Sequence, residues 1–170
     1  MIGTLISGLL IMGGLTVLRQ IDKAKVDNEV NELSRYKKKT VSLGAQRGGA
    51  FSGVTLQTVV ALDFFRPDIV TGAAGARVVS NQWGGTINVT PASFPAADDT
   101  LMYRYTGVPA AACKQLGMQA ASVASGVVVQ GTWVKSTVAV SGSSNINQGQ
   151  LIATCDQATN NATIDFYLTK

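Results

Sequence analysis

Few residues of this 170-residue chain have the types and spacing that catalysis requires. The chain contains no histidine, which removes the commonest general base and the usual ligand of a catalytic metal. Asp98 and Asp99 are adjacent carboxylates, but neighbouring side chains in a loop after Pro95 point apart more often than they converge on one proton. The sequence has no GxSxG nucleophile motif and no P-loop. We therefore expect no catalytic residue, no metal site and no cofactor, and we do not expect an enzyme.

Cys113 and Cys155 are the two residues that could form a covalent link. They lie far apart in the sequence, without the paired spacing or the histidines of a zinc site. A disulfide formed in an oxidising compartment fits such a pair, and it would contribute roughly 4 kcal/mol by restricting the unfolded chain. Two buried, reduced thiols are the alternative.

The positive charge of the chain is concentrated near one end. The formal net charge is +4, and residues 19–47 hold eight basic and four acidic side chains, so the whole excess falls in this stretch. Its densest part, residues 35–39, contains Tyr36 as the one aromatic residue. A nucleic-acid interface needs a basic face with several aromatic rings on which bases stack. We therefore expect these side chains to face solvent or lipid head groups, and we expect no nucleic acid as a partner.

The first 18 residues (MIGTLISGLLIMGGLTVL) carry no charged side chain. As a helix they would be about 27 Å long, slightly shorter than the roughly 30 Å hydrocarbon core of a bilayer, and Arg19 and Lys23 could reach its polar edge. They lack the basic start and the cleavage site of a secretory signal peptide, so we expect them to remain on the chain. Small residues spaced four apart, such as Gly3 and Ser7, would let helices approach closely.

The helical pattern continues beyond residue 18 without proline or glycine until Gly44, which predicts one rod of about 60 Å over residues 1–44. Gly13 and Gly14 are its weakest point, since each costs roughly 1 kcal/mol relative to alanine, and we expect flexibility and local unwinding there. The amphipathic half, residues 19–44, carries a rough apolar stripe that needs a surface to pack on. The stripe consists of Leu18, Ile21, Val26, Val30 and Leu33. The polar side chains Asp27, Asn28, Asn31 and Arg35 lie opposite.

Residues 45–170 are predicted to form a globular head rich in strands. Residues 45–76 form a glycine-rich variable loop with one short helix near the apolar run 54–65, ending before Pro67. A further helix is expected to open at Pro109. Alternating or β-branched segments predict strands at 77–80, 86–90, 101–106, 123–130, 132–140, 151–155 and 164–168, with a polar loop at 141–150. Within 101–106 the odd-numbered residues should share one face and the even-numbered ones the other. The result is an α+β fold in which an antiparallel sheet packs on the long helix.

This arrangement resembles the type IV pilins, and more specifically the type IVb subclass, which contains the toxin-coregulated and bundle-forming pilins and the thin-pilus pilins of conjugative plasmids. The likeness is carried by the apolar helix that runs into an amphipathic one, the antiparallel sheet and the two cysteines of the C-terminal half. Short motifs add to it: NQWGG at residues 81–85, YTGVP at 105–109 followed by Ala112 and Cys113, and DFYLTK at 165–170. The resemblance covers nearly the whole chain.

The resemblance implies a type IV pilin fold and a structural pilus subunit. Such subunits are trimmed by a prepilin peptidase, held in the bacterial inner membrane by the first helix, and stacked by an assembly machinery into an extracellular pilus of identical subunits. The filament serves adhesion, aggregation or conjugation, and residues 113–155 would be the disulfide-bounded region exposed on it. The assembly interface would consist of Met1, Ile2, Leu5, Ile6, Leu9, Leu10, Ile11, Met12, Leu15, Val17 and Leu18.

One position departs from the pilin pattern. These proteins usually carry a glutamate five residues into the mature chain, where this sequence has Leu5, and its first acidic residue is Asp22. Two interpretations are compatible with the difference. Either the numbering begins a few residues inside the mature protein, or the subunit lacks the glutamate, as some minor subunits do. The second would remove the usual charge pairing with the N-terminus of a neighbouring subunit.

Two other functions are compatible with the same sequence. In one, the apolar helix only anchors a periplasmic binding module that never polymerises. In the other, the protein is a pseudopilin or minor pilin of a secretion system. Imaging of sheared surface material distinguishes these functions, because a major pilus subunit yields long filaments.

Overall fold

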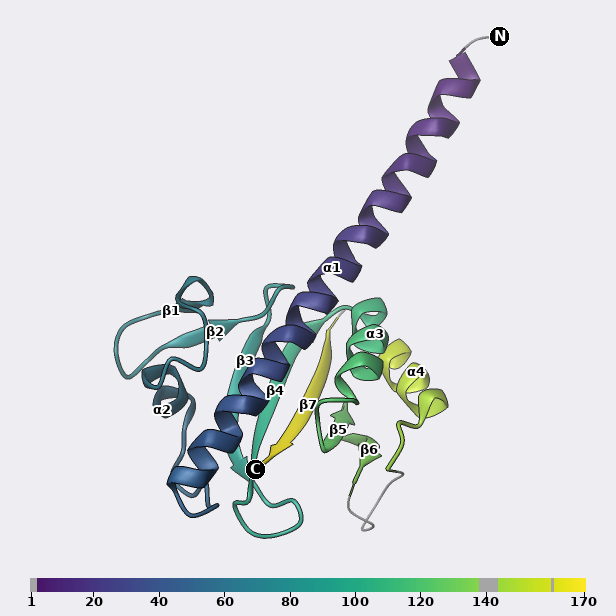
Figure 1. The fold of residues 1–170 in the computed structure, drawn as a ribbon. Coiled ribbons are helices and arrows are strands. Elements are labelled where there is room, and N and C mark those ends of the chain that lie inside the picture. The colour runs from purple at the N-terminus through teal and green to yellow at the C-terminus, as the bar shows by residue number, and fades with distance from the viewer. Residues whose placement is uncertain (1–2, 138–143, 160) are drawn as a thin grey trace.

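The helix α1 (Gly3–Gln46) is the longest element of the protein, and its 44 residues correspond to about 66 Å. The structure is a computed structural model that describes the backbone of residues 3–137, 144–159 and 161–170, and the side chains of these ranges from residue 22 onward. Figure 1 shows the C-terminal half of α1 lying across the head and the backbone of its N-terminal half leading away from it. The helix ends two residues beyond the predicted Gly44, because the Arg47 N–H still bonds the Leu43 carbonyl, at 3.1 Å.

Within its described residues, the head is built on a seven-stranded sheet with strand order β1-β2-β3-β4-β7-β5-β6, in which every pair of neighbours is antiparallel. Its strands are β1 (Val70–Thr71), β2 (Val78–Ser80), β3 (Thr86–Ala92), β4 (Thr100–Val108), β5 (Gly126–Val129), β6 (Thr132–Ser136) and β7 (Ala162–Thr169). The last strand of the chain, β7, therefore lies in the interior of the sheet, between β4 and β5.

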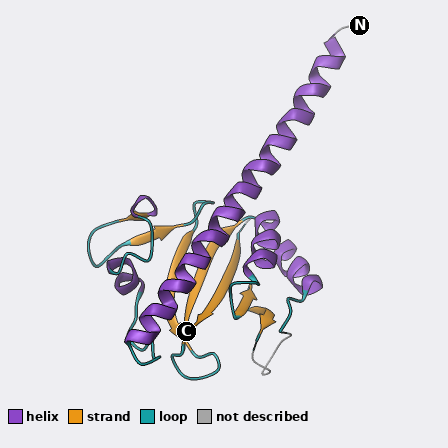
Figure 2. Cartoon of the chain, viewed as in Figure 1, coloured by secondary structure: helices purple, strands orange, loops and turns teal. Residues whose placement is uncertain are grey.

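Helices cover one face of this sheet. They are α1, the short α2 (Leu56–Ala61), the 3-10 turn η1 (Pro67–Ile69), α3 (Ala110–Ala120) and α4 (Gln148–Gln157). α1 crosses the central strands, α3 packs against both α1 and β7, and α4 packs against α3, β5 and β6 (Figure 2). We call this side of the sheet the covered face and the opposite side, on which the described residues form no helix, the open face.

A seam of buried residues on α1 holds the helix to the covered face. Six buried positions are spaced alternately by three and four residues: Val26, Glu29, Leu33, Tyr36, Thr40 and Leu43; Gly44, next to the last of them, is buried as well. The predicted apolar stripe is confirmed at Val26 and Leu33, whereas Val30 is only half-buried and the side chains of Leu18 and Ile21 lie outside the described residues. The prediction missed Glu29 and Thr40 because it admitted apolar residues alone, and it missed Tyr36 and Leu43 because it ended at Leu33. We refer to these six positions as the seam.

The centre of the seam contacts an aromatic cluster. The ring of Tyr36 stacks on that of Tyr103, with centroids 5.5 Å apart, and meets Phe65 edge-on at 4.8 Å. The hydroxyls of Thr40 and Tyr103 are hydrogen-bonded at 3.1 Å. Because aromatic rings bury large areas, this cluster connects α1, β4 and the loop before η1 into one core.

The strand β4 alternates as predicted. Leu101, Tyr103 and Tyr105 are buried on the covered face, while Arg104 is exposed on the open one. The predicted strands at 77–80, 86–90 and 164–168 are confirmed within a few residues, and the helix opening at Pro109 is confirmed as α3. The strand predicted at 123–130 starts later, because the Val123 and Ala124 N–H groups still bond Ala120 at the end of α3. Residues 138–140 of the strand predicted at 132–140 lie outside the described residues.

The strand predicted at residues 151–155 is wrong, since these residues belong to the helix α4. The Asn147 side chain caps this helix by accepting a hydrogen bond from the Gln150 N–H, at 3.1 Å. The buried residues Leu151, Thr154 and Cys155 follow the three-and-four spacing of one helix face. The polar loop predicted at 141–150 accordingly ends at Asn147, and its residues 141–143 lie outside the described residues. β-branched composition suggested a strand, but the packing needs a helix.

The variable loop at 45–76 contains more structure than predicted. The expected short helix is α2, which Thr55 caps through its side chain. Beyond it, Pro67 starts η1 rather than only ending a helix, and Val70–Thr71 adds the edge strand β1 to the sheet. Proline suits this place, because its fixed φ angle favours the first position of a helical turn.

Candidate assembly site

The predicted assembly interface occupies the N-terminal half of α1. From Gly3 onward the backbone of this half is helical, as expected. Met1 and Ile2 lie outside the described residues, and so do the side chains of the other predicted interface positions up to Leu18. The role of these residues in assembly therefore stays a prediction.

The backbone of α1 is helical at Gly13 and Gly14, so the local unwinding predicted there is not seen in this conformation. Helical hydrogen bonding on both sides offsets the roughly 1 kcal/mol that each glycine costs. Flexibility at the pair stays a prediction. In the part of the chain whose side chains the structure describes, no helical stretch is both long and apolar enough to cross a membrane.

The turn at residues 81–85 joins the sheet to α1 near the level at which the helix leaves the head. Asn81 organises the turn: its Oδ1 accepts the N–H groups of Trp83 and Gly85, both at 3.0 Å, and its Nδ2 donates to the Thr106 carbonyl at 2.8 Å. Gly85 is required because a Cβ atom there would lie 1.8 Å from the Thr106 carbonyl oxygen. This packing explains the NQWGG motif in terms of backbone approach.

Glu29 is the acidic member of the seam, and its side chain is directed at this turn. Its Oε1 accepts a hydrogen bond from the Gln82 N–H at 2.9 Å, and the residue is 4% exposed. Burial raises the pKa of Glu29 from 4.5 to about 7, against the hydrogen bond from Gln82 and the nearby Tyr105 hydroxyl, which lower it. The same burial, reinforced by Glu29, raises the pKa of Tyr105 well above its usual value, so the phenol stays neutral. Glu29 therefore titrates near neutral pH.

The two cysteines join the helices of the C-terminal part of the head. Cys113 on α3 and Cys155 on α4 form a disulfide with a Cα–Cα distance of 5.8 Å, so the disulfide prediction is confirmed and the free-thiol alternative is wrong. Beside it, Gly117 lets the two helices approach, because a Cβ atom there would lie 2.7 Å from Leu151 Cδ1. The bridge and this contact hold α4 against α3.

Lys135 on β6 closes the end of α3. Its Nζ donates to the Ala124 carbonyl at 2.7 Å and also to the Ala121 carbonyl. Burial lowers the pKa of Lys135. A cation at this place also interacts favourably with the negative end of the helix dipole. Lys135 therefore links β6 to the C-terminal end of α3.

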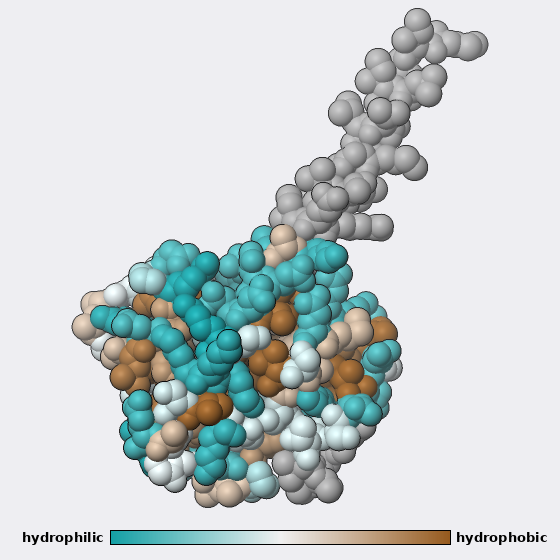
Figure 3. Space-filling model, in the orientation of Figure 1, coloured by the Kyte–Doolittle hydropathy of each residue, from teal (hydrophilic) through white to brown (hydrophobic). Residues whose placement is uncertain are grey.

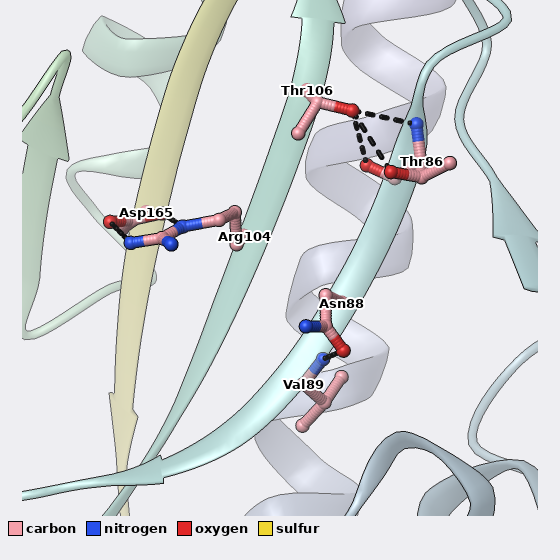
Figure 4. Close-up of polar contacts among 6 residues, drawn as sticks. All are labelled: Thr86, Asn88, Val89, Arg104, Thr106 and Asp165. Carbon is pink, nitrogen blue, oxygen red and sulfur yellow. Dashed lines mark hydrogen bonds and ion pairs between the residues drawn. The ribbon is translucent and has the colours of Figure 1, made fainter.

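The open face of the sheet carries fixed polar side chains, shown in Figure 4. Arg104 on β4 donates two hydrogen bonds to Asp165 on β7, from Nε and Nη2, each at 2.8 Å. Next to them, the hydroxyls of Thr86 and Thr106 pair across β3 and β4 at 2.9 Å. The hydrogen bonds and the negative charge of Asp165 raise the pKa of Arg104. These cross-strand pairs fix the register of the three central strands on the side without helices.

A second part of the open face carries an aromatic cluster. Phe94 stacks on Trp133 at 5.5 Å between centroids, and Tyr167 contacts Trp133 at 4.8 Å. The loop that carries Phe94 is held by Asp99, whose carboxylate accepts the Phe94 N–H at 2.7 Å and the Ala96 N–H at 3.2 Å. Asp99 thus stabilises a loop, and both Asp98 and Asp99 are half-buried.

The helix-bearing side of the head exposes mostly hydrophilic residues with separate hydrophobic patches (Figure 3). The large apolar residues that are exposed among the described ones come from different elements: Val41, Leu62, Val78, Met118 and Ile152. Single apolar residues of this kind are normal on a protein surface, so they do not by themselves mark a binding site.

Sequence reasoning missed three polar groups that the structure makes important: Glu29, Lys135 and the Arg104–Asp165 pair. A signal existed for Glu29, which lies three residues after Val26 and four before Leu33, on the helical face of both. The Arg104–Asp165 pair had no local signal, because it depends on the register between β4 and β7.

Comparisons with known proteins agree with this architecture. The family described as PilS N terminal matches residues 23–168. Among solved structures, the type IVb pilin from Salmonella typhi is similar with a TM-score of 0.63 and 16% sequence identity, over 85% of this chain and 99% of that one. TcpA, a type IV pilin from the Vibrio cholerae El Tor biotype, is similar with a TM-score of 0.52 and 14% identity, over 82% of this chain and 98% of that one. A sequence comparison with curated proteins gives no significant match.

The family match covers the C-terminal half of α1 and nearly all of the head, and the two solved structures show the same fold over 85% and 82% of this chain. The resemblance predicted from the sequence is therefore confirmed. The chain belongs to the PilS N-terminal family, and it has the fold of the type IVb pilins.

Proposed function

We propose that the protein is a structural pilus subunit that assembles with identical copies into an extracellular filament through the N-terminal half of α1. One observation carries the proposal: α1 is a single helix from the head to Gly3, and the sequence of its outer half has no charged residue before Arg19. Apolar side chains are stable away from water. We infer that a lipid bilayer surrounds this half before assembly and that the same helices of other subunits surround it afterwards.

The cellular route follows from the same proposal. The subunit is held in the bacterial inner membrane, processed by a prepilin peptidase and passed by the assembly machinery into the pilus. Membership of a pilin-type family and the pilin fold support this route. The task of the filament is adhesion, aggregation or conjugation, and its role is structural rather than enzymatic. The head, including the disulfide-bounded residues 113–155, supplies the outer surface of the fibre.

The test is a lysine in the proposed helical core. Leu9→Lys or Leu10→Lys places a charge among packed apolar helices, which costs far more than it costs in the exposed head. We expect a folded head and no filaments in negative-stain images of sheared surface material. Leu9→Ile is the matched control, because it keeps an apolar side chain of the same size, and it should yield filaments.

The outcome distinguishes the proposed functions. Filaments of normal length from the lysine variants would contradict assembly through α1. A wild-type chain that is abundant in the membrane but yields no filament would favour the anchored periplasmic binding module, or a pseudopilin or minor pilin. In that case the chain without residues 1–21 should be tested for ligand binding as a monomer.

A further inference from the structure

The contact between α1 and the turn at 81–85 depends on an ionisable group. Glu29 lies three residues after Val26, the first buried residue of α1 among those whose side chains are described, and residues 22–24 are exposed. Its Oε1 accepts a hydrogen bond from the Gln82 N–H at 2.9 Å. The same turn is attached to β4 by the hydrogen bond from Asn81 to the Thr106 carbonyl. One carboxyl group thus joins the helix to the sheet at the level where α1 leaves the head.

The groups that surround this carboxyl group do not neutralise its charge. Glu32 and Tyr36 act on it from α1, Tyr105 from β4 and Arg66 from the loop before η1. The guanidinium of Arg66 is paired elsewhere: its Nη2 lies 3.1 Å from Asp68 Oδ2 and its Nε lies 3.8 Å from Glu32 Oε1.

The surroundings of Glu29 also leave polar groups without partners. The hydroxyls of Tyr36 and Tyr105 and the indole Nε1 of Trp83 are buried and make no hydrogen bond of acceptable geometry in the described structure. The Tyr105 hydroxyl interacts electrostatically with Glu29 but falls short of hydrogen-bond geometry. The Tyr105 hydroxyl lowers the pKa of Glu29, because an O–H group can donate toward a carboxylate, but this effect is smaller than that of burial.

We propose that Glu29 is a pH-responsive contact between α1 and the head, which we call the latch. The protonated carboxyl group holds the first buried turns of α1 against the turn at 81–85, and ionisation favours their release. The protonated form keeps the bond from Gln82 through its carbonyl oxygen. The ionised form regains hydration by moving toward water, since a buried carboxylate without a cation is strongly disfavoured. Burial has already moved the pKa of this group to about 7, so the change falls in a physiological range.

Release should be confined to the N-terminal part of the seam, at Val26 and Glu29. C-terminal to Glu29, α1 is held by the stacked rings of Tyr36 and Tyr103 and by the hydrogen bond between Thr40 and Tyr103. None of these groups ionises near neutral pH, because burial raises the pKa of both tyrosines. Ionisation of Glu29 therefore weakens the attachment of α1 where the helix leaves the head, while the head itself stays folded. This inference concerns a single subunit and does not depend on filament formation.

Hydrogen–deuterium exchange of the full chain in detergent micelles tests the latch. Rates are measured between about pH 5 and about pH 8 and corrected for intrinsic chemical exchange. The backbone amides of residues 29–33 and of Gln82 should lose at least about tenfold protection as the pH rises, because a difference of one pKa unit corresponds to a factor of ten. Glu29→Gln, which keeps the acceptor and cannot ionise, should show high protection at every pH.

Asp27→Asn is the matched control. Asp27 lies two residues earlier and accepts a hydrogen bond from Gln119 Nε2 at 3.2 Å, a contact that asparagine can keep. This variant should retain the pH dependence of the wild type. Wild-type protection that does not change with pH, or an unchanged dependence in Glu29→Gln, would overturn the proposal. Should Glu29→Gln fail to fold, the carbon-13 titration of Glu29 in the wild type decides, and a midpoint below about pH 5 also overturns it.

Discussion

The two faces of the sheet each bury a carboxylate, but they balance its charge differently. On the open face Asp165 is 5% exposed and receives two hydrogen bonds from Arg104, each at 2.8 Å. On the covered face Glu29 is 4% exposed and receives one backbone hydrogen bond, from Gln82. Burial is nearly equal at the two sites, so the difference lies in the available cation. Only where a guanidinium accompanies the carboxylate is its charge matched by a fixed opposite charge.

The reason for the difference is the space above each face. Arg104 lies across β4 and β7 with its side chain 47% exposed, so it pairs with Asp165 while remaining partly hydrated. Under α1 the corresponding space is filled by the seam and by the rings of Tyr36 and Tyr105. A cation there would lose its water, and the nearby Arg66 instead pairs with Glu32 and Asp68 at the edge.

The largest effect should come from removing the disulfide beside the covered face. Cys113→Ser combined with Cys155→Ser should lower the free energy of unfolding by roughly 2–5 kcal/mol, because the unfolded chain is no longer restricted. Guanidinium unfolding of the head measures it. Reduced wild-type protein is the control and should unfold like the variant. Equal stability of oxidised wild type and variant would show that the packing of α3 on α4 needs no covalent link.

The second-largest effect should come from removing the ionisable group of Glu29, and it should depend on pH. A folded-state pKa of about 7 against 4.5 in the unfolded chain means that the native state binds the Glu29 proton more tightly. Its contribution to stability is therefore fully present below about pH 4.5 and is lost as the pH rises to about 7. Glu29→Gln should be more stable than wild type at pH 8, by up to about 3 kcal/mol, and similar at pH 4.5. Urea unfolding at both pH values measures this, and an equal difference at both would contradict it.

Breaking the ion pair on the open face should have a moderate effect. Arg104→Met leaves Asp165 buried without its cation and should cost roughly 2 kcal/mol, less than for a fully buried pair because Arg104 is half in water. Adding Asp165→Asn should restore part of the loss, since it removes the unpaired charge. Thermal unfolding of the two variants measures the coupling. If the double variant is less stable than Arg104→Met alone, the pair is not what holds Asp165 in place.

The smallest effect concerns a neutral hydrogen bond of the covered face. Thr40→Val preserves the shape of the seam but leaves the buried Tyr103 hydroxyl without its partner, which should cost about 1 kcal/mol. Combining it with Tyr103→Phe removes both polar groups and should recover most of this loss. A double-mutant cycle from chemical unfolding gives the coupling. A coupling near zero would mean that stacking alone holds Tyr36 and Tyr103 against each other.

Local patterns were sufficient for much of the fold. The long run without proline predicted α1, the alternation of residues 101–106 predicted the two faces of β4, and Pro109 marked the start of α3. A chain with only two cysteines permits only one internal disulfide. These features depend on residues that are close in sequence or on the number of cysteines, so they can be predicted without knowing which segments pack together in the fold.

The helix α4 shows where local reasoning failed. Residues 151–155 contain β-branched and small side chains that suit a strand, and no periodicity over five residues excludes one. The helix is decided by Asn147, which caps it, and by contacts of Leu151 with Gly117 and of Cys155 with Cys113. Both of these contacts join residues more than 30 positions apart. Tertiary packing here outweighs a weak intrinsic preference.

The division of the chain into a charge-free apolar segment, an amphipathic helix and a strand-rich head can be predicted without the fold, because hydrophobic periodicity and charge placement are local properties. Two features depend on the folded arrangement of distant segments. The strand β7 enters the sheet between β4 and β5, which brings Asp165 to Arg104, and Glu29 faces the 81–85 turn without a cation. The charge state of a buried carboxylate depends on which distant groups surround it, and those are known only once the chain has folded.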